Sequence, residues 1–278
     1  MLETAFAKIN LALHVRRRRD DGYHDIETIF AFAEHGDVVE VVEGPPGLTI
    51  TGPFAGALGG TDAEDNLVMR AVRGLASLPG TGQAPAIRLD KRLPVAAGIG
   101  GGSADAAAAI RLLSRLWGIG PNDPRIDSIA AGLGADVPAC LLSMTTRGDG
   151  RGDELHPVEA TGLAGMPLLL VNPGIALATG PVFSGWDGRD RGGLDAGDPL
   201  AAALAGRNDL ETPARALSPV IADVVAILGE QPGTILARMS GSGATCFALF
   251  ASDRDRDAAA RHIAAIRPSW WRLESRIR

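Results

Sequence analysis

Apolar and polar residues follow one another along this chain in a pattern that predicts a mixture of strands and helices. Short runs with β-branched enrichment or alternating polarity predict strands at residues 37–43, 48–51, 86–90, 167–171, 234–238 and 245–250. Apolar residues at helical spacing predict helices near 67–75, 103–116, 124–133, 212–228 and 253–266. No internal repeat with a period of about 20 to 50 residues is present, which excludes solenoids and propellers.

Several of these helices are preceded by residues that favour a helix start. They are Asp65 or Asn66, Ser103 with Asp105 in the first turn, Asp123 followed by Pro124, and Thr212 followed by Pro213. Gly134 follows the helix near 124–133 and is a natural stop for it. The ends of these helices are therefore predicted more sharply than the apolar spacing alone allows.

The second half of the chain has its own order of elements. From residue 167 the order is strand, helix, strand, strand, helix, strand, which is typical of a ferredoxin-like layer. Residues 154–165 lack a clear period, so we expect an α+β protein of two domains, residues 1–157 and 158–278. Residues 178–207 are rich in Gly, Asp and Arg with little period and are expected to form a long loop, either a functional lid or disordered.

Charge and composition exclude several classes of protein. The net charge of −6 argues against a protein that coats nucleic acid, and no stretch approaches the roughly 20 apolar residues of a membrane span. The run Arg16 to Arg19 follows the apolar N-terminus, the reverse of a secretory signal, and is expected to form a charged hairpin turn with Asp20 and Asp21. Cys140 and Cys246 form no metal or disulfide pattern. We therefore expect a cytoplasmic protein with reduced thiols that binds neither nucleic acid nor membranes; its oligomeric state stays open.

A glycine-rich segment carries the first chemical signal. It consists of Pro94, Val95, Ala96, Ala97, Gly98, Ile99, Gly100, Gly101, Gly102, Ser103 and Ala104. Glycines at the start of a helix let the backbone approach a ligand, and the free N–H groups there favour an anion, so the segment indicates a phosphate-binding loop. It lacks the Gly-Lys-Ser/Thr of a Walker A loop, and a serine stands where a dinucleotide motif needs its third glycine. A flexible turn capped by Ser103 is the alternative.

Two other segments make the interpretation specific. One contains Lys8 and Asn10 in a strand-like run, followed by Asp21-Gly22-Tyr23-His24; the other is a second glycine loop with Ser240, Gly241, Ser242 and Gly243. With the glycine-rich segment, these resemble the GHMP kinase superfamily over essentially the whole chain. Segments 132–138, 172–174 and 208–209 agree with it. The resemblance implies an N-terminal domain like ribosomal protein S5 domain 2 and a ferredoxin-like C-terminal domain.

The resemblance also implies a reaction. The most similar members phosphorylate the 2-hydroxyl of 4-(cytidine 5′-diphospho)-2-C-methyl-D-erythritol in non-mevalonate isoprenoid synthesis, with ATP as co-substrate and Mg²⁺ as its companion. It makes Asp136 the catalytic carboxylate that accepts the hydroxyl proton, with Lys8 beside it to stabilise developing charge. Asn10 orients Lys8 or the phosphates. Taken alone, Asp136 is typical of a cap or turn residue, and Lys8 is equally a lysine on an edge strand.

Substrate recognition is implied for a second group. Tyr23 and His24 match residues that recognise cytosine, Phe183 matches an aromatic on the other face of the base, and Thr179 lies four residues before it. Without the resemblance, Tyr23 and His24 are ordinary core or turn residues.

The sequence departs from the family where Ala96, Ala97 and Ala104 replace common glycines and a serine. Two alternatives stay open. One is a homoserine or mevalonate kinase, which would have no use for a cytosine site. The other is a regulatory protein that binds nucleotide without turnover, which would not need both Lys8 and Asp136.

Overall fold

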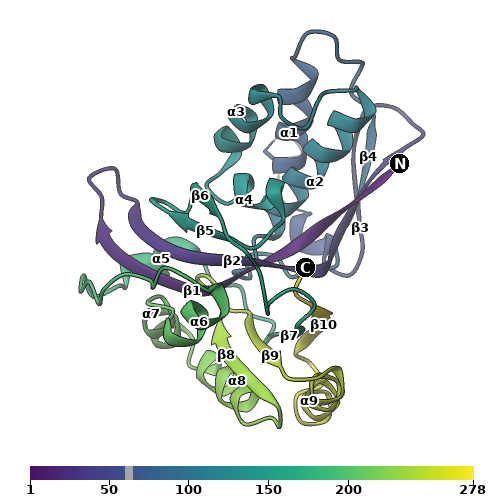
Figure 1. Ribbon diagram of the computed structural model, residues 1–278. Helices are drawn as coiled ribbons and strands as arrows, with labels where there is room; N and C mark the ends of the chain where they lie inside the picture. The colour runs from purple at the N-terminus through teal and green to yellow at the C-terminus, as the bar shows by residue number, and fades with distance from the viewer. Residues whose placement is uncertain (60–64) are drawn as a thin grey trace. The chain divides into compact units, whose positions relative to one another are not determined.

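The computed structural model describes residues 1–59 and 65–278, which form two compact units with interleaved segments. The first unit contains Met1–Ala7, His35–Val95 and Gly100–Ser143, and the second contains Lys8–Glu34, Ala96–Ile99 and Met144–Arg278. The long paired strands β1 (Leu2–Arg18) and β2 (His24–Val42) run through both units (Figure 1). The boundary expected between residues 157 and 158 stays a prediction.

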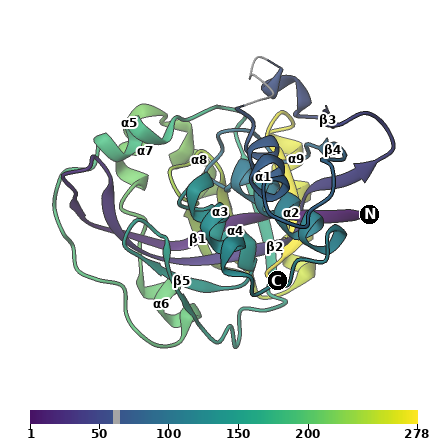
Figure 2. The same ribbon diagram turned by 90° about the horizontal axis from the view of Figure 1, so that it is seen from above.

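The first unit places four helices beside a small set of strands. The end of β2 pairs antiparallel with β4 (Ala86–Asp90), and β4 pairs parallel with β3 (Gly47–Thr51). The helices, which group together in Figure 1 and Figure 2, are α1 (Leu67–Ala76), α2 (Gly101–Leu116), α3 (Pro124–Leu133) and α4 (Val137–Leu142). A short 3₁₀ turn covers Ala55–Leu58. The buried alanines 106–109 let α2 pack closely against both α1 and α4.

Two helix starts of the first unit are confirmed, and one was wrong. The Asn66 side chain accepts from the N–H of Val68 at 2.9 Å, and that of Asp123 accepts from the N–H of Arg125 at 3.0 Å. The helix α2 instead begins at Gly101, after Gly100 with a φ of +62°, and has no side-chain cap. Ser103 therefore does not cap α2, because glycine adopts the left-handed conformation by itself and leaves the first N–H groups uncovered.

The second unit is built on a four-stranded antiparallel sheet in the order β10, β7, β9, β8. These strands are Trp271–Arg276, Pro167–Asn172, Cys246–Phe250 and Thr234–Met239, and α9 (Asp253–Ile266) connects β9 to β10. The predicted order of strands in this half is confirmed, but four helices, not one, separate β7 from β8. The sequence pattern gave no residue range for β10, and it missed the first half of β2 and the short strands β5 (Thr146–Asp149) and β6 (Glu154–Pro157).

Two predictions for this half were wrong. The helix expected over 212–228 is two helices, α7 (Glu211–Leu217) and α8 (Val220–Gly229). Pro219 lacks an N–H and disfavours helical geometry in Ser218, so the chain turns there although the apolar stripe continues. The loop expected over 178–207 contains α5 (Thr179–Ser184) and α6 (Pro199–Ala205).

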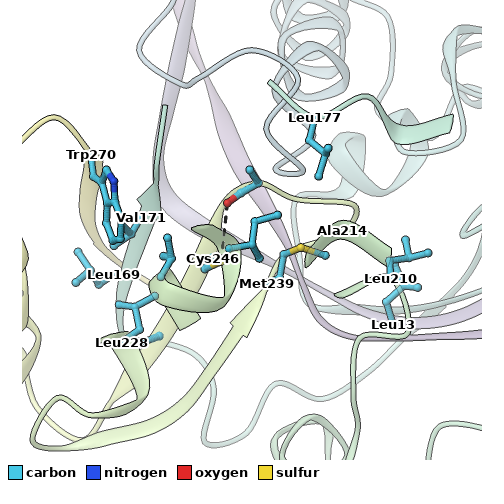
Figure 3. Close-up of a cluster of buried hydrophobic side chains, with 14 of the residues drawn as sticks. Leu13, Leu169, Val171, Leu177, Leu210, Ala214, Leu228, Met239, Cys246 and Trp270 are labelled. Carbon is cyan, nitrogen blue, oxygen red and sulfur yellow. Dashed lines mark hydrogen bonds between the residues drawn. The ribbon is translucent and has the colours of Figure 1, made fainter. Parts of the chain in front are cut away.

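A buried apolar cluster holds the second unit together (Figure 3). Leu169 and Val171 of β7 pack with Leu228 of α8, and all three are fully buried. Cys246 lies in the same cluster with its Sγ 3.8 Å from the carbonyl of Ala244, and burial raises the pKa of its thiol. Neither cysteine forms a disulfide, and both are buried. Among the described residues, no helix has the length and apolar character needed to cross a membrane.

Replacing Leu228 by Ala tests this core. The truncation is expected to lower the free energy of unfolding by about 2–5 kcal/mol, because it leaves a cavity in a fully buried cluster. Leu217→Ala is the matched control, since that side chain in α7 is 53% exposed and its loss should cost less than about 0.5 kcal/mol. Urea denaturation followed by circular dichroism measures both; equal losses would contradict the packing.

Candidate active site

The two glycine-rich loops meet within the second unit, backbone against backbone. A Cβ added to Gly98 would lie 2.5 Å from the carbonyl oxygen of Ser240 and 2.7 Å from the backbone N and O of Gly243. Gly98 has a φ of +73° and Gly241 one of +53°, a conformation that favours glycine. The hydroxyl of Ser240 donates to the Gly98 carbonyl at 2.9 Å. Any larger side chain at residue 98 would push the loops apart.

Asn208 and Arg238 hold the second glycine loop in place. The Asn208 side-chain amide donates to the carbonyls of Met239 and Gly241, at 2.9 and 2.8 Å. Arg238, on β8, donates to the carbonyls of Leu11, Ala203 and Gly206 at 2.5–2.8 Å. Burial lowers the pKa of Arg238. Sequence analysis assigned no role to either residue, because their partners are backbone groups far away in the chain.

Lys8 and Asn10 lie side by side on β1, and both are buried. The Nζ of Lys8 donates to Oδ1 of Asn10 at 3.0 Å and lies 5.1 Å from the ring centre of Phe30. The Asn10 side chain in turn donates to the Thr28 hydroxyl at 2.8 Å, and its backbone N–H donates to the Ser240 hydroxyl at 3.2 Å. Hydrogen bonds thus fix both the backbone and the side chain of Asn10, and its side-chain Oδ1 points at the Lys8 ammonium.

Asp136 lies in the first unit, at the residue that precedes α4. Its side chain makes no cap hydrogen bond to the helix. The far end of α4 is held by Arg111 of α2, which donates to the carbonyl of Cys140 at 2.7 Å and to the Ser143 hydroxyl at 3.1 Å. Lys8 belongs to the second unit, so the expected pairing of Lys8 with Asp136 stays a prediction.

The phosphate-loop segment contains an unusual residue. Ala96 has a φ of +52°, in the left-handed region that L residues other than glycine rarely occupy. Ala96 is also one of the positions at which this chain departs from the glycines common in the resembling family. The backbone conformation therefore explains why glycine is favoured there. Ala97 lies outside that region and is buried.

His24, Phe183 and Trp186 form an aromatic cluster in the second unit. The His24 ring lies 5.1 Å from Phe183 in a tilted arrangement and 5.8 Å from Trp186 edge to face. The Nε2 of His24 and the Nε1 of Trp186 are buried without a hydrogen-bond partner in the described part of the chain. Sequence analysis missed Trp186, because a single tryptophan in a Gly- and Asp-rich stretch carries no periodic signal.

Arg18 affects this cluster in two ways. Its guanidinium donates to the carbonyls of Ser184 and Trp186 at 2.8 and 2.9 Å and so fixes the segment that carries the aromatic rings. Burial, and then the positive charge of Arg18, lower the pKa of His24. His24 is therefore neutral at physiological pH, when one ring nitrogen donates and the other accepts.

The remaining expected substrate residues lie around these groups. The Thr179 hydroxyl is 3.1 Å from that of Ser242, so the start of α5 contacts the second glycine loop. Tyr23 is 54% exposed, and the guanidinium of Arg151 lies 5.0 Å from its ring centre. The structure thus brings His24 and Phe183 together, and Lys8 with Asn10. The roles of all these residues stay predictions.

Comparison with known proteins gives the family. The model described as "GHMP kinases N terminal domain" matches residues 66–144, and that described as "GHMP kinases C terminal" matches residues 194–267. A protein of Rhizorhabdus wittichii named 4-diphosphocytidyl-2-C-methyl-D-erythritol kinase is 69% identical over 99% of this chain and 94% of its own. The chain belongs to the GHMP kinase family. A relative from Sphingopyxis alaskensis with the same name is 51% identical over 100% of this chain and 99% of its own.

Solved structures of GHMP kinases agree with the fold. A 4-(cytidine 5′-diphospho)-2C-methyl-D-erythritol kinase is 32% identical, covers 99% of both chains and has a TM-score of 0.78. A homoserine kinase from Cytophaga hutchinsonii has a TM-score of 0.70 at 19% identity, over 97% of this chain and 95% of its own. The α+β fold with two domains of the GHMP kinase type is thereby confirmed. The second likeness shows the fold alone, because the GHMP kinase fold serves several substrates.

Exchanging Ala96 for Gly tests the left-handed residue of this GHMP kinase. The variant is expected to be more stable by about 0.5–1 kcal/mol, because the relief of left-handed strain exceeds the added chain entropy of glycine. The neighbouring Ala97→Gly should instead lower stability by about 0.5–1 kcal/mol, since no strain is relieved there. Chemical denaturation measures both; a loss of stability in Ala96→Gly would refute the strain.

Exchanging Arg18 for Gln tests the environment of His24. The glutamine amide can still donate to the carbonyls, but the positive charge is lost, so the pKa of His24 should rise. NMR titration of the imidazole protons measures it. Because the folded-state pKa is below 6.5, the contribution of His24 to stability is present above about pH 6.5 and declines as the pH falls; Arg18→Gln should weaken that decline.

Arg17→Gln is the matched control for this experiment. Arg17 pairs with Asp25 at 2.5 Å on the exposed side of the same strand, so its loss should leave the His24 titration close to that of the wild type. If the two variants shift the titration equally, Arg18 has no particular effect on His24.

Proposed function

We propose that this chain transfers the γ-phosphoryl group of ATP to the 2-hydroxyl of 4-(cytidine 5′-diphospho)-2-C-methyl-D-erythritol, in non-mevalonate isoprenoid precursor synthesis. The observation that carries the proposal is the 69% identity, over 99% of the chain, to a relative named for this substrate. The aromatic contact between His24 and Phe183 supports it, because a cytosine ring requires flat apolar faces and a neutral hydrogen-bonding edge. The cytoplasm is the expected location.

The chemistry assigns a role to each polar group. Asp136 accepts the proton as the 2-hydroxyl oxygen attacks the γ-phosphorus; the new P–O bond forms while the β–γ bond breaks and ADP leaves with its electron pair. The ammonium of Lys8, oriented by Asn10, stabilises the negative charge on the acceptor oxygen. Tyr23, His24, Thr179 and Phe183 bind the cytidylyl part. The segment of residues 94–104 binds ATP, with its backbone N–H groups on the phosphates, and the second glycine loop at residues 240–243 packs against it at Gly98.

Mg²⁺ is expected to accompany ATP. Among the described residues, no group of three or more His, Cys, Asp or Glu side chains is placed to hold a metal ion. Mg²⁺ commonly keeps several waters and binds through substrate phosphates, which needs few protein ligands. The donor groups of this chain therefore fit a metal that enters with the nucleotide, where it would neutralise phosphate charge.

A coupled assay of ADP release tests the substrate. The cytidylyl substrate should give turnover, whereas homoserine and mevalonate should give none above background, because neither presents a base to His24 and Phe183. A mevalonate kinase shares the fold at a TM-score of 0.70 and 10% identity, over 100% of this chain and 99% of its own, so the fold does not discriminate. Turnover with homoserine or mevalonate alone would reject the proposal. No turnover, with retained ATP binding, would favour a regulatory protein.

Asp136→Asn tests the proton acceptor. The amide keeps the shape and loses the basic oxygen, so kcat should fall by about 10² to 10⁴-fold, while ATP affinity stays within a few-fold. Asp127→Asn on α3 is the matched control, because that carboxylate is exposed, and it should keep wild-type kcat. An Asp136→Asn enzyme with more than about a tenth of wild-type kcat would remove Asp136 from this role.

Phe183→Leu tests base recognition. Phe183 also packs against the apolar core, so truncation to Ala would lower stability as well, whereas Leu keeps apolar bulk and loses the aromatic face. Stacking on an aromatic ring is worth about 1–3 kcal/mol, so kcat/KM for the cytidylyl substrate should fall by about 5- to 150-fold. The KM for ATP should not change. A Phe183→Leu enzyme with wild-type kcat/KM would assign Phe183 to the core alone.

A further inference from the structure

Lys91 follows β4 in the first unit and is buried between two carboxylates. Its Nζ lies 2.5 Å from Oδ2 of Asp37 and 2.7 Å from Oδ2 of Asp105, and all three side chains are at most 4% exposed. A buried charge destabilises the folded state unless it is paired, and here the two carboxylates pair with the buried ammonium. None of the roles proposed above uses it.

The triad connects the two flanks of the phosphate-loop segment. Asp37 accepts from the backbone N–H groups of Arg92 and Leu93, at 2.5 and 2.8 Å, directly before the segment begins at Pro94. Asp105 lies in α2, directly after the segment ends at Ala104. Lys91 joins the two carboxylates, so the chain enters and leaves the segment at positions fixed by one ammonium group.

The ammonium also lies beside the first turn of α2. A Cβ added to Gly101, the first residue of the helix, would be 3.1 Å from the Nζ of Lys91, and no described side chain caps this helix start. A positive charge there adds to the attraction that a helix N-terminus has for phosphate. A net negative charge in the triad would oppose it.

The two carboxylates are not equivalent. Asp37 accepts three hydrogen bonds, whereas Oδ1 of Asp105 is buried without a partner in the described part of the chain. Burial raises the pKa of Asp105 to about 8. The positive charge of Lys91 opposes this rise, and Asp37 adds to it. Lys91 is therefore the group that holds Asp105, whereas Asp37 is also fixed by the backbone.

We propose that Lys91, held between Asp37 and Asp105, is a positioning residue that fixes the start of α2 and the entry to the phosphate-loop segment and thereby sets the affinity for ATP. The proposal rests on the function proposed above for ATP, but not on the identity of the phosphoryl acceptor. It predicts that disturbing the triad changes the KM for ATP and leaves the KM for the second substrate nearly unchanged.

Lys91→Met is the direct test. Methionine keeps the unbranched stem and removes the ammonium, so the KM for ATP should rise about tenfold or more, while the KM for the cytidylyl substrate stays within about twofold. Calorimetric titration with a non-hydrolysable ATP analogue should show the same loss. Arg88→Met is the matched control, because Arg88 lies on β4 beside the triad but pairs with Glu40 on the exposed side.

Asp105→Asn provides a second test that does not depend on the folding of Lys91→Met. Asparagine keeps the size of the side chain and removes the carboxylate that pairs with Lys91, so the KM for ATP should rise about fivefold or more. The KM for the cytidylyl substrate should stay within about twofold of the wild-type value.

The outcomes separate this proposal from the proposed function. An ATP affinity of Lys91→Met within about twofold of wild type, or an equal rise in both KM values with a lower melting temperature, would overturn the positioning role. A KM for ATP of Asp105→Asn within about twofold of the wild-type value would also overturn it. A wild type that binds the ATP analogue but does not phosphorylate the cytidylyl substrate would reject the proposed acceptor alone, and the effect of Lys91→Met on ATP binding would still stand.

Discussion

The organisation of the second unit depends on one close approach, that of Gly98 to the loop of residues 240–243. No Cβ fits at Gly98, because it would lie 2.5 Å from the carbonyl oxygen of Ser240. Because the two loops are so close, the hydroxyl of Ser240 can donate to the Gly98 carbonyl while it accepts from the backbone N–H of Asn10. A single serine thus ties β1 to both glycine loops. The position of Asn10, and through it that of the Lys8 ammonium, therefore depends on the absence of a side chain at Gly98.

Two buried polar atoms without hydrogen-bond partners among the described residues lie where the base of the substrate is expected to bind. Most buried polar atoms in proteins are hydrogen-bonded, so each exception needs an explanation. The Nε2 of His24 and the Nε1 of Trp186 lack partners within the same aromatic cluster. The neutral imidazole that burial and Arg18 favour has both a donor and an acceptor to offer. Such an edge suits a cytosine, which itself carries donors and acceptors side by side.

Local signals predicted much of the fold, and non-local contacts explain what they missed. The caps at Asn66 and Asp123 act within three residues and were predicted correctly. Pro219 also acts locally, but the apolar stripe continues across it and led to the prediction of a single helix. Trp186 depends on a contact with His24 across more than 160 residues, which no local pattern encodes. Resemblance to a family, not periodicity, pointed to Lys8 and Asp136.

The two lysines of the chain show how side-chain chemistry is matched to position. All but two of the 27 Lys and Arg residues are arginine, and both lysines are buried. Arginine at residue 238 is satisfied by three backbone carbonyls, which its planar fork can reach together. The Lys8 ammonium donates to an amide oxygen and faces an aromatic ring, and the Lys91 ammonium pairs with two carboxylates. An ammonium carries its charge at one atom in both places, whereas a guanidinium spreads its charge over a planar group with five N–H donors. Lysine is therefore retained where a positive charge must be concentrated at a single atom, next to the groups proposed to handle phosphate.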